Sequence, residues 1–383
     1  MTTRAAGDVA NGEGASDAIA VVVVHHHAAS LLARAVGSVR MDLAAAGLRG
    51  EIVVVDNGSL PDEISLLRGL PVRVLEPGVN LGFAGGVNLG VTSTRAPLLV
   101  AMNPDVEVRA GCLRALVSVL EAGAAVAGPR FFWDREKRFL LPPTELRTRR
   151  EELRRRFAPA GPRSLARARR SWRRHAWEHW RAERALASRS LSGALLAFRR
   201  DAWRQVGPLD TGFRLYFEDD DWVSRVASSG LRTAYVPAAE AVHLHNQSAR
   251  AEPRAAAWFA ASAVRFAHRH YGTAFVRAAD AMTRLASTPA RRPETDASPP
   301  LDGSPPRLSA AAVASTISSA PTWVEVSPAP LGFPAAAERV EADALPSWRL
   351  PEEVWRHLAP GRYGVRLVSD AGRELWEGWF ARL

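Results

Sequence analysis

The chain has 383 residues, enough for two domains of which one must be large. Hydrophobic residues make up 47% and charged residues 23% of the sequence, as in ordinary globular proteins, and no run approaches the roughly 20 apolar residues of a membrane-spanning helix. The single cysteine, Cys112, excludes a disulfide framework and fits a reducing compartment. Residues 1–17 are polar and lack the apolar core of a signal peptide, so we expect a disordered N-terminus and a cytoplasmic protein.

The net charge of +10 favours a polyanionic partner or surface. Nearly all of the positive charge is arginine, because Lys137 is the only lysine. The planar guanidinium group gives two parallel hydrogen bonds to a phosphate. A GC-rich coding sequence would also favour arginine over lysine, so the arginine preference alone is weak evidence for a phosphate-bearing ligand.

The first third of the chain alternates buried strands with amphipathic helices. Short β-branched apolar runs predict strands, and apolar residues repeating every three to four positions predict helices. The expected strands are residues 19–24, 52–55, 72–75 and 97–102, and the expected helices are 31–43, 85–93 and 113–123. This alternation predicts an α/β fold, a mixed and mostly parallel sheet with helices on both faces.

The pattern changes near Trp133. Residues 134–190 are dense in arginine with interleaved tryptophans, and we interpret them as a helical insertion in a domain of residues 18–286. Residues 287–321 are rich in Pro, Ser and Ala and predict a linker. Residues 322–383 predict a small β-rich module, with a hairpin turn at 369–372. We expect this module to be accessory, so that a chain ending near Pro321 folds and stays active.

Two motifs follow predicted strands in the first part of the sheet. The run VVVDNGS at 53–59 places Asp56 and Asn57 beyond a strand, where ligands of open α/β sheets collect. The run NLGFAGGVNLG at 80–90 places glycines before a helix, where backbone N–H groups can approach a diphosphate. A polar turn and tight helix packing, respectively, are the plainer explanations of these two runs.

Acidic residues mark two later positions. Asn103-Pro104-Asp105 follows a third buried strand, where a carboxylate can hold a cation that grips phosphate oxygens. Four consecutive acids, residues 218–221, follow an aromatic pair, and His243 and His245 come later. Acids are favoured at a helix N-terminus, but four adjacent like charges repel unless a cation or a proton intervenes.

These motifs in this order, together with Ser192-Gly193-Ala194, resemble family 2 glycosyltransferases of the GT-A fold. The closest resemblance is to the rhamnosyltransferase-like branch, and it covers residues 18–270. It implies an inverting transfer from a nucleotide-diphospho-sugar, with dTDP-rhamnose favoured by analogy. The implied acceptor is a glycan or a polyprenyl-linked saccharide of cell-surface polysaccharide synthesis, at the inner face of the membrane.

The resemblance also assigns roles to residues of this chain. Asp219 would be the catalytic base, with Glu218 or Asp221 as alternatives. Asp105 and His243 would hold Mg²⁺ or Mn²⁺. The residues implied at the nucleotide sugar are Asp56, Asn57, Asn80, Gly85, Gly86, Asn88 and Asn103. The chain departs from the family at residues 25–27, three histidines where relatives carry a Thr-Tyr-Asn-like triplet, which leaves the nucleobase open.

Other functions compete with this interpretation. Arginine with interleaved aromatics, as in residues 135–184, is typical of surfaces that bind single-stranded nucleic acid. No nucleic-acid-binding motif accompanies it, so we expect no nucleic-acid partner and place this stretch beside the acceptor or an anionic membrane. A nucleotidyltransferase would need basic residues in the first strand–helix loop, which holds histidines instead. A catalytically dead sugar-binding relative is the third alternative, since Asn103 replaces one metal-motif acid.

Overall fold

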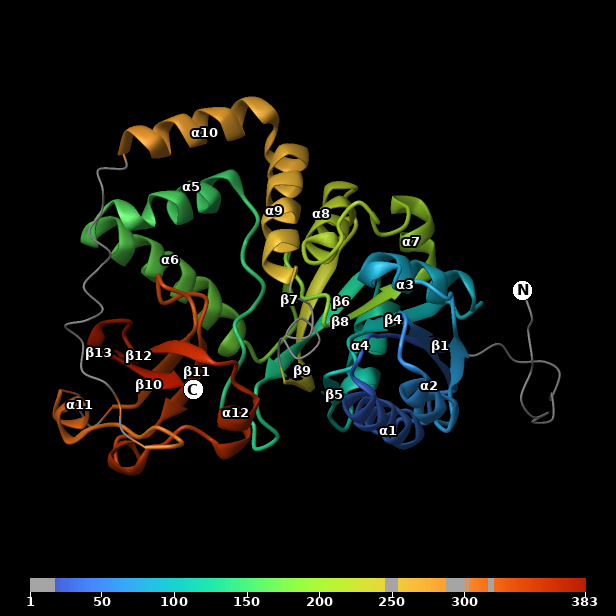
Figure 1. Ribbon diagram of the computed structural model, residues 1–383, viewed down its shortest axis with the longest axis horizontal. Coiled ribbons are helices and arrows are strands. Elements are labelled where there is room, and N and C mark those ends of the chain that lie inside the picture. Colours follow the sequence, from blue (N-terminus) through green and yellow to red (C-terminus); the bar gives the residue numbers. More distant parts are fainter. Residues whose placement is uncertain (1–17, 245–253, 287–300, 302, 316–319) are drawn as a thin grey trace.

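The computed structural model describes residues 18–244, 254–286, 301, 303–315 and 320–383. Residues 1–17, His245 and a large part of the predicted linker lie outside these ranges. In the described part, the chain forms a large mixed sheet and a smaller antiparallel sheet, with helices around and between them (Figure 1).

The first half of the large sheet is parallel. Strand β1 pairs with β2 on one side and β4 on the other, and β2 pairs with β3. Every residue of β1 is buried, because neighbouring strands flank it and helices cover both faces. This part confirms the predicted alternation; its elements are β1 (Ile19–His25), α1 (Ala29–Ala45), β2 (Gly50–Asp56), α2 (Pro61–Arg68), β3 (Arg73–Leu75), α3 (Gly82–Thr92) and β4 (Leu98–Met102).

The second half of the large sheet mixes directions. Strand β8 runs antiparallel between β4 and β6, and β9 pairs with β6, β5 and β7. The overall order is β3-β2-β1-β4-β8-β6-β9-β5. The elements are β5 (Val106–Val108), α4 (Cys112–Glu121), β6 (Val126–Phe132), β7 (Leu186–Ala187), β8 (Leu195–Arg199), α7 (Arg200–Val206), α8 (Glu218–Ser228) and β9 (Thr233–His243).

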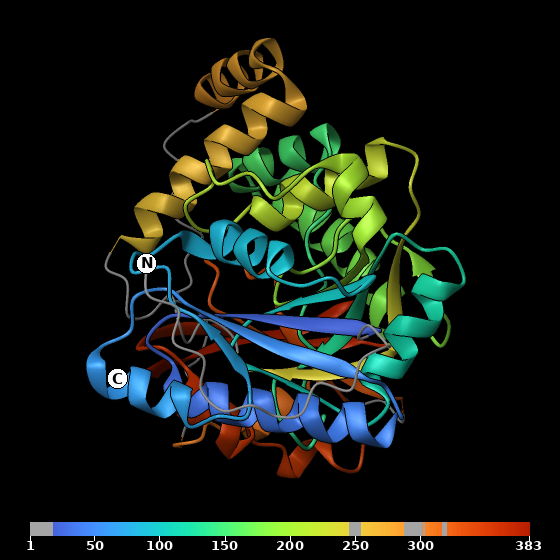
Figure 2. The same cartoon turned by 90° about the vertical axis from the view of Figure 1, so that its right-hand side faces the viewer.

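Helices cover both faces of the large sheet, as the sequence predicts (Figure 2). Side chains of α1 and α4, among them Leu32 and Leu116, pack on one face. Side chains of α3, α7 and α8, among them Val87 and Trp222, pack on the other. The two apolar layers fix the strand ends, and so the positions of the polar residues that follow them.

The insertion is helical, as expected. It forms α5 (Arg149–Phe157), a 3₁₀ turn (Ala158–Ala160) and α6 (Pro162–Trp180). Two further helices, α9 (Ala255–Tyr271) and α10 (Thr273–Ala286), follow the large sheet; in Figure 1, α10 lies along the top and α9 runs vertically below one end of it. Among the helices that the structure describes, none combines the length and hydropathy needed to cross a bilayer.

The C-terminal sheet is antiparallel, in the order β11-β10-β12-β13. The predicted hairpin is confirmed: β12 pairs with β13, and Gly372 N–H donates to Ser369 O across the turn at 2.8 Å. Part of the predicted linker packs on this module, because Leu301 N–H donates to Trp379 O and Leu308 and Ala312 are buried. The elements are α11 (Ala310–Ala314), β10 (Thr322–Ser327), β11 (Ala336–Val340), a 3₁₀ turn (Leu345–Ser347), α12 (Glu352–His357), β12 (Gly361–Ser369) and β13 (Glu374–Arg382).

A single residue of the insertion joins the two sheets. Leu140 forms an isolated bridge with Phe132 of β6 and another with Ala337 of β11. Leu140 N–H donates to Ala337 O at 2.8 Å, and Ala337 N–H donates back to Leu140 O at 2.9 Å. Backbone hydrogen bonding therefore runs from the large sheet through the insertion to the C-terminal sheet.

Arginines of α6 point into the interface with the C-terminal sheet. Arg173 donates to Glu325 at 2.6 Å, and Arg366 of β12 donates to the other oxygen of Glu325 at 2.8 Å. All three side chains are at most 3% exposed. Burying such a group of charges has a large desolvation cost. Removing one member would therefore destabilise the folded state, because the remaining charges would be buried without a partner.

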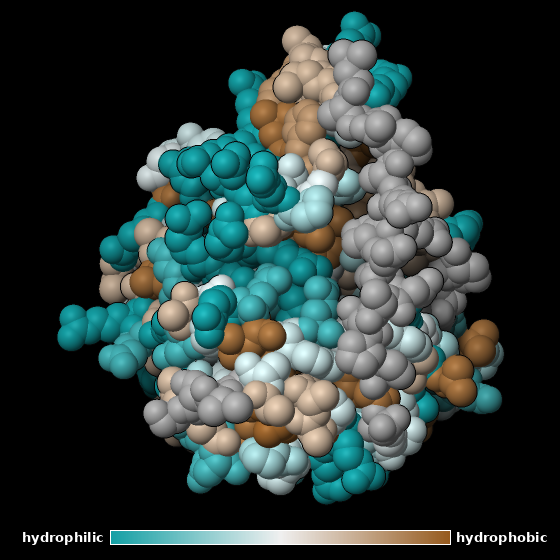
Figure 3. Space-filling model, turned by 90° about the vertical axis from the view of Figure 1, so that its left-hand side faces the viewer, coloured by the Kyte–Doolittle hydropathy of each residue, from teal (hydrophilic) through white to brown (hydrophobic). Residues whose placement is uncertain are grey.

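The tryptophans of α6 lie in the same interface. Trp172 stacks on Phe333, and Trp180 stacks on Trp323. The expectation that this stretch presents its arginine and tryptophan side chains to an acceptor or a membrane is therefore wrong for these residues, because they are buried against the C-terminal sheet. Figure 3 views the molecule from the insertion and C-terminal side; hydrophilic side chains cover much of this face, and hydrophobic ones appear in separate spots.

Candidate functional site

A cavity of about 490 Å³ opens beyond the carboxyl ends of β1, β2 and β4. The insertion contributes residues 141–145 and Arg147 to its wall, and the C-terminal module contributes Pro334. The sequence-predicted residues that line it are Asn57, Asn80, Asn103, Asp105, Glu218, Asp219 and His243. Those that do not line it are Asp56, Gly85, Gly86, Asn88 and Asp221.

Strand pairing brings Asp105 and His243 together. β5 and β9 are antiparallel neighbours with Val106 opposite His243, and Leu244 N–H donates to Asp105 O at 3.2 Å. The Asp105 Oδ1 and His243 Nε2 atoms lie 3.4 Å apart, and both side chains are largely buried at the cavity wall. A carboxylate and an imidazole at this separation suit one divalent cation that takes its other ligands from a diphosphate and water.

The acidic cluster begins α8 after two strained residues. Tyr216 and Phe217 have φ of 65° and 69°, which is unusual for residues with side chains. Their backbone turns the chain sharply into α8, so that Glu218 and Asp219 line the cavity in its first turn. Strain of this kind persists where the surroundings impose it, and it is concentrated at functional sites.

Asp221 faces away from the cavity. Its carboxylate accepts hydrogen bonds from Arg225 at 2.9 Å and His270 at 2.8 Å, and Arg269 lies 3.1 Å away. Burial by itself raises the pKa of Asp221, but these hydrogen bonds and charges lower it below its usual value. Asp221 therefore ties α8 to α9, and the structure does not support it as an alternative base.

Asp220 is paired with the insertion. Arg147 donates to its Oδ2 at 2.8 Å, while the guanidinium of Arg147 lies 4.6 Å from the centre of the Phe217 ring. Burial raises the pKa of Asp220 to about 7, with Arg147 opposing the rise and Asp219 adding to it. Nothing in the sequence singles out Arg147, because its partner lies 73 residues away and the insertion contains many other arginines.

Glu218 and Asp219 remain as cavity acids. Glu218 is buried and its Oε2 has no hydrogen-bond partner among the described residues; burial first, and then the Asp219 charge, raise its pKa well above the usual value. Asp219 is more exposed, and Gly193 N–H donates to its Oδ2 at 2.6 Å. A side chain at position 193 would collide with Asp219, since a Cβ there would lie 2.7 Å from the Asp219 Cβ. The glycine therefore permits the contact that orients Asp219.

The asparagines of the donor side are held by backbone groups. Asn57 donates to Gly82 O at 3.0 Å and accepts from Leu81 N–H at 3.2 Å. Asn80 accepts from Gly82 N–H at 2.8 Å. These bonds fasten the ends of β2 and α3 to one another and leave both amides at the cavity wall.

Four residues predicted at the nucleotide sugar instead have structural contacts. Asp56 is buried and accepts from Ser59 N–H at 3.1 Å, and Asn88 exchanges hydrogen bonds with the Leu209 backbone at 2.8 and 3.0 Å. A Cβ at Gly86 would lie 2.7 Å from Val24, and one at Gly85 would lie 2.8 Å from Leu81. The placement of these two glycines beside the donor is not supported: they allow tight packing, Gly86 of α3 on β1 and Gly85 within the first turn of α3.

The three consecutive histidines separate. His25 ends β1 and is fully buried, and burial lowers its pKa. His26 lines the cavity, with its Nδ1 3.2 Å from Asn57 O. His27 pairs with Glu63 of α2 at 2.8 Å. Only His26 can contact a ligand in the cavity.

Residues 20–178 match the model of the family described as Glycosyl transferase family 2. The chain is 29% identical over 243 residues to the N-acetylglucosaminyl-diphospho-decaprenol L-rhamnosyltransferase of Mycobacterium tuberculosis, covering 58% of this chain and 76% of that protein. The family match at residues 20–178 includes the cavity residues Asn57 and Asp105 and ends before Asp219 and His243.

Solved structures are similar at lower identity. One is a mannosyltransferase from Pyrobaculum calidifontis in complex with GDP-Man and Mn²⁺, with TM-score 0.42, 17% identity, and coverage of 74% of this chain and 80% of that one. Another is GalNAc-T7 with UDP, GalNAc and Mn²⁺, with TM-score 0.41, 18% identity and coverage of 60% of this chain. The chain spans 43% of the length of that second protein.

Proposed function

We propose, on the premise that residues 20–178 form a family 2 glycosyltransferase domain, that the chain transfers a sugar from a nucleotide-diphospho-sugar to a saccharide acceptor with inversion. The observation that carries this proposal is the cavity itself. It gathers the amides of Asn57 and Asn80, the pair Asp105–His243, and the carboxylate of Asp219 around one space of about 490 Å³. That volume is in the range of ligand pockets.

The surroundings of the four acids of α8 leave Asp219 as the candidate base. Asp221 and Asp220 have cationic partners, and the raised pKa of Glu218 favours its neutral form. Asp219 is then the carboxylate that faces the cavity, oriented by Gly193 N–H. A base must lie within hydrogen-bond reach of the proton that it accepts, and Asp219 satisfies this for an acceptor hydroxyl in the cavity.

The transfer exchanges one bond at the anomeric carbon for another. The acceptor hydroxyl oxygen attacks that carbon from the face opposite the diphosphate, its proton passes to Asp219, and the bond to the nucleoside diphosphate breaks. Asp105 and His243 would hold a divalent cation, Mg²⁺ or Mn²⁺, whose chemistry is to offset negative charge on the departing diphosphate. Asn57, Asn80 and Asn103 would position the donor through their side-chain amides.

The donor and acceptor are proposed by analogy with the mycobacterial relative. Its name specifies transfer of L-rhamnose to a decaprenyl-diphosphate-linked N-acetylglucosamine. We propose dTDP-rhamnose as the first donor to test, and a lipid-linked saccharide at the cytoplasmic face of a membrane as the acceptor. The aromatic side chains of Trp258 and Phe259 at the cavity wall could contact such an acceptor.

The structure does not favour nucleic acid as the partner. Single-strand binding surfaces use exposed aromatic rings and unpaired cations. Here Trp172 and Trp180 are buried, and the α5 and α6 arginines with carboxylate partners are Arg154, Arg155, Arg156, Arg169 and Arg173. Trp172, Trp180, Arg169 and Arg173 therefore face the interior of the fold and are not available to a nucleic acid.

A thermal-shift panel of nucleotide sugars tests the donor, since a ligand that binds the folded state raises the melting temperature by mass action. We expect one nucleotide-diphospho-sugar to raise it in the presence of Mg²⁺ or Mn²⁺, and that donor to support transfer to a lipid-linked N-acetylglucosamine analogue. The matched sugar without nucleotide is the control. A chain that binds no nucleotide sugar under these conditions would contradict the proposal.

A further inference from the structure

The last two turns of α6 place three metal-ligating residues on one face. His175, Glu178 and His179 stand at positions i, i+3 and i+4, and one ligand atom of each lies within 4.8 Å of the other two. The two histidines are buried and Glu178 is exposed. None of the three lines the 490 Å³ cavity.

Both imidazoles donate one ring N–H to a backbone carbonyl. His175 Nε2 lies 3.0 Å from Thr144 O, and His179 Nδ1 lies 2.9 Å from His175 O. A carbonyl only accepts, so each bonded nitrogen carries hydrogen and the other nitrogen of a neutral ring carries a lone pair. Metal-bound histidines are oriented in this way, by donating the second N–H to a carbonyl or carboxylate.

Among the described residues, the other ring nitrogen of His179 makes only a long contact with a hydroxyl. Its Nε2 is 3.4 Å from the Ser188 hydroxyl, but that hydroxyl donates to Ser190 O at 2.8 Å. A neutral imidazole with a free lone pair is the form that binds a metal.

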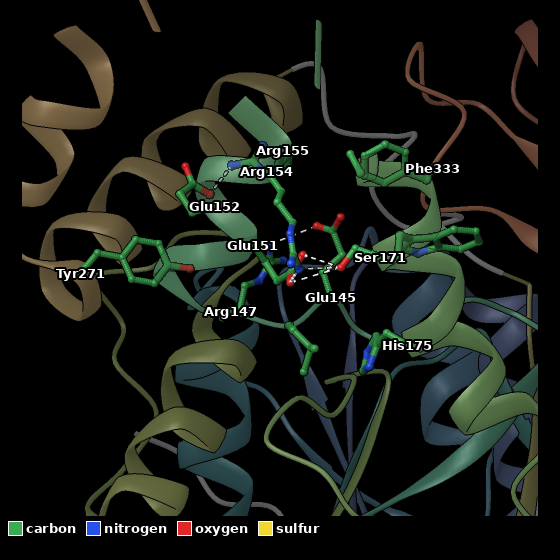
Figure 4. A pocket seen from close by; sticks show the side chains of 13 residues that line it. Glu145, Arg147, Glu151, Glu152, Arg154, Arg155, Ser171, His175, Tyr271 and Phe333 are labelled. Carbon is green, nitrogen blue, oxygen red and sulfur yellow. Dashed lines mark hydrogen bonds and ion pairs between the residues drawn. The ribbon is translucent and has the colours of Figure 1, made fainter. Parts of the chain in front are cut away.

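Carboxylates surround His175. It lies near Glu178, Glu151 and Glu145, the last two across the small pocket between α5 and α6 (Figure 4). Glu151 and Glu145 are paired with Arg154 and Arg147, respectively. No described residue forms a salt bridge or hydrogen bond with the side chain of Glu178, so its charge is available to a cation.

We propose that His175, Glu178 and His179 bind a divalent transition-metal ion at a site separate from the sugar-transfer cavity. Two imidazoles and one carboxylate favour Zn²⁺ over the oxygen-preferring Mg²⁺. Three protein ligands leave a fourth position for water. Because His175 also holds the carbonyl of Thr144, a residue of the cavity wall, the bound ion fixes the ring that supports this wall.

The test titrates Zn²⁺ into the metal-free full-length chain in excess Mg²⁺, which occupies oxygen-rich sites. We expect one equivalent to bind and to raise the melting temperature, and Co²⁺ to give the visible absorption of a low-coordinate site. Glu178→Gln, an exposed change that should leave the fold intact, should weaken Zn²⁺ binding by tenfold or more. Glu183→Gln, the same change at an exposed glutamate outside the group, should leave it unchanged.

A second pair of variants tests the imidazole. His179→Asn should abolish stoichiometric Zn²⁺ binding, whereas His268→Asn, at an exposed histidine of α9, should not. The proposal is overturned if the wild-type chain binds no Zn²⁺, or if Glu178→Gln binds it as tightly as wild type. Either result leaves Mg²⁺-dependent sugar transfer unaffected, so the two proposals fail separately.

Discussion

Carboxylates of two regions in the described chain have different surroundings. At the C-terminal interface, Glu325 has two arginines on its two oxygens. At the cavity, Glu218 lacks a hydrogen-bond partner for Oε2 among the described residues, and Asp219 accepts from backbone N–H groups. Charge paired across the interface holds two parts of the fold together, whereas charge left facing a cavity can act on a ligand.

The arginines of the insertion have ion-pair partners in both regions. Five of those in the insertion pair with acids of the C-terminal module: Arg135, Arg138, Arg169, Arg173 and Arg181. Another, Arg147, reaches the cavity acids and pairs with Asp220. The insertion is thus a structural link between the two regions, and the predictions below test whether the link and the cavity are separable.

Truncation before Thr322 should have the largest effect. It removes β10 to β13 and exposes Trp172, Trp180 and Arg173, which lie against them. Contrary to the expectation from sequence, we predict a chain that fails to fold cooperatively, measured by circular dichroism and thermal unfolding. A truncated chain with a sharp transition and full activity would show that the module is accessory after all.

Removal of divalent cations should have the second largest effect. It tests the cavity and leaves the C-terminal interface unchanged. Chelator should reduce transfer to near background, and Mg²⁺ or Mn²⁺ should restore it. Without a cation at Asp105 and His243, nothing in this pair offsets the negative charge on the departing diphosphate. Asp105→Asn should not be restored at the same cation concentration. Chelator-insensitive transfer would argue against a cation at this pair.

Asp219→Asn should lower the transfer rate by about 10²–10⁴-fold, the usual contribution of a general base. The donor-induced thermal shift should persist, because the amide keeps the shape of the side chain and the Gly193 contact. Single-turnover transfer and donor binding would be measured together. Near-normal turnover would move the role of base to Glu218.

Glu325→Gln tests the interface alone. It leaves Arg173 and Arg366 buried without their shared carboxylate, and we expect a loss of about 3–5 kcal/mol in the free energy of unfolding. Glu377→Gln, at a partly exposed partner of Arg169, should cost less than about 1 kcal/mol. Urea unfolding compares the two variants; equal losses would mean that the buried group has no special role.

The pH dependence of stability gives the smallest effect. Since the folded pKa of Asp220, about 7, lies above its ordinary value, its protonated form is favoured in the native state, and stability is lost as pH rises toward 7. Asp220→Asn should therefore flatten the fall in the free energy of unfolding between pH 5.5 and 8 by about 1–2 kcal/mol relative to wild type. Identical pH profiles for variant and wild type would place the Asp220 pKa near its ordinary value.

Features of the fold that depend on local pattern could be predicted from the amino-acid sequence. Strand–helix alternation placed β1 to β4 and their helices, and turn residues placed the hairpin at 369–372, because periodicity and turn chemistry act over a few residues. Motif order placed Asn103, Asp105 and Asp219 at strand or helix ends, where the cavity forms. Family resemblance then supplied the expected chemistry.

Only the tertiary structure decided which residues of each motif reach the cavity. The sequence could not show that Asp221 turns toward His270, that Gly86 packs on Val24, or that Arg173 meets Glu325 152 residues away. These outcomes depend on burial and on distances through space, since a charge pairs with the nearest desolvated partner whatever its position in the chain. For the same reason, part of the arginine-rich stretch predicted as a ligand-facing surface, namely Arg169, Trp172, Arg173 and Trp180, lies in an internal interface.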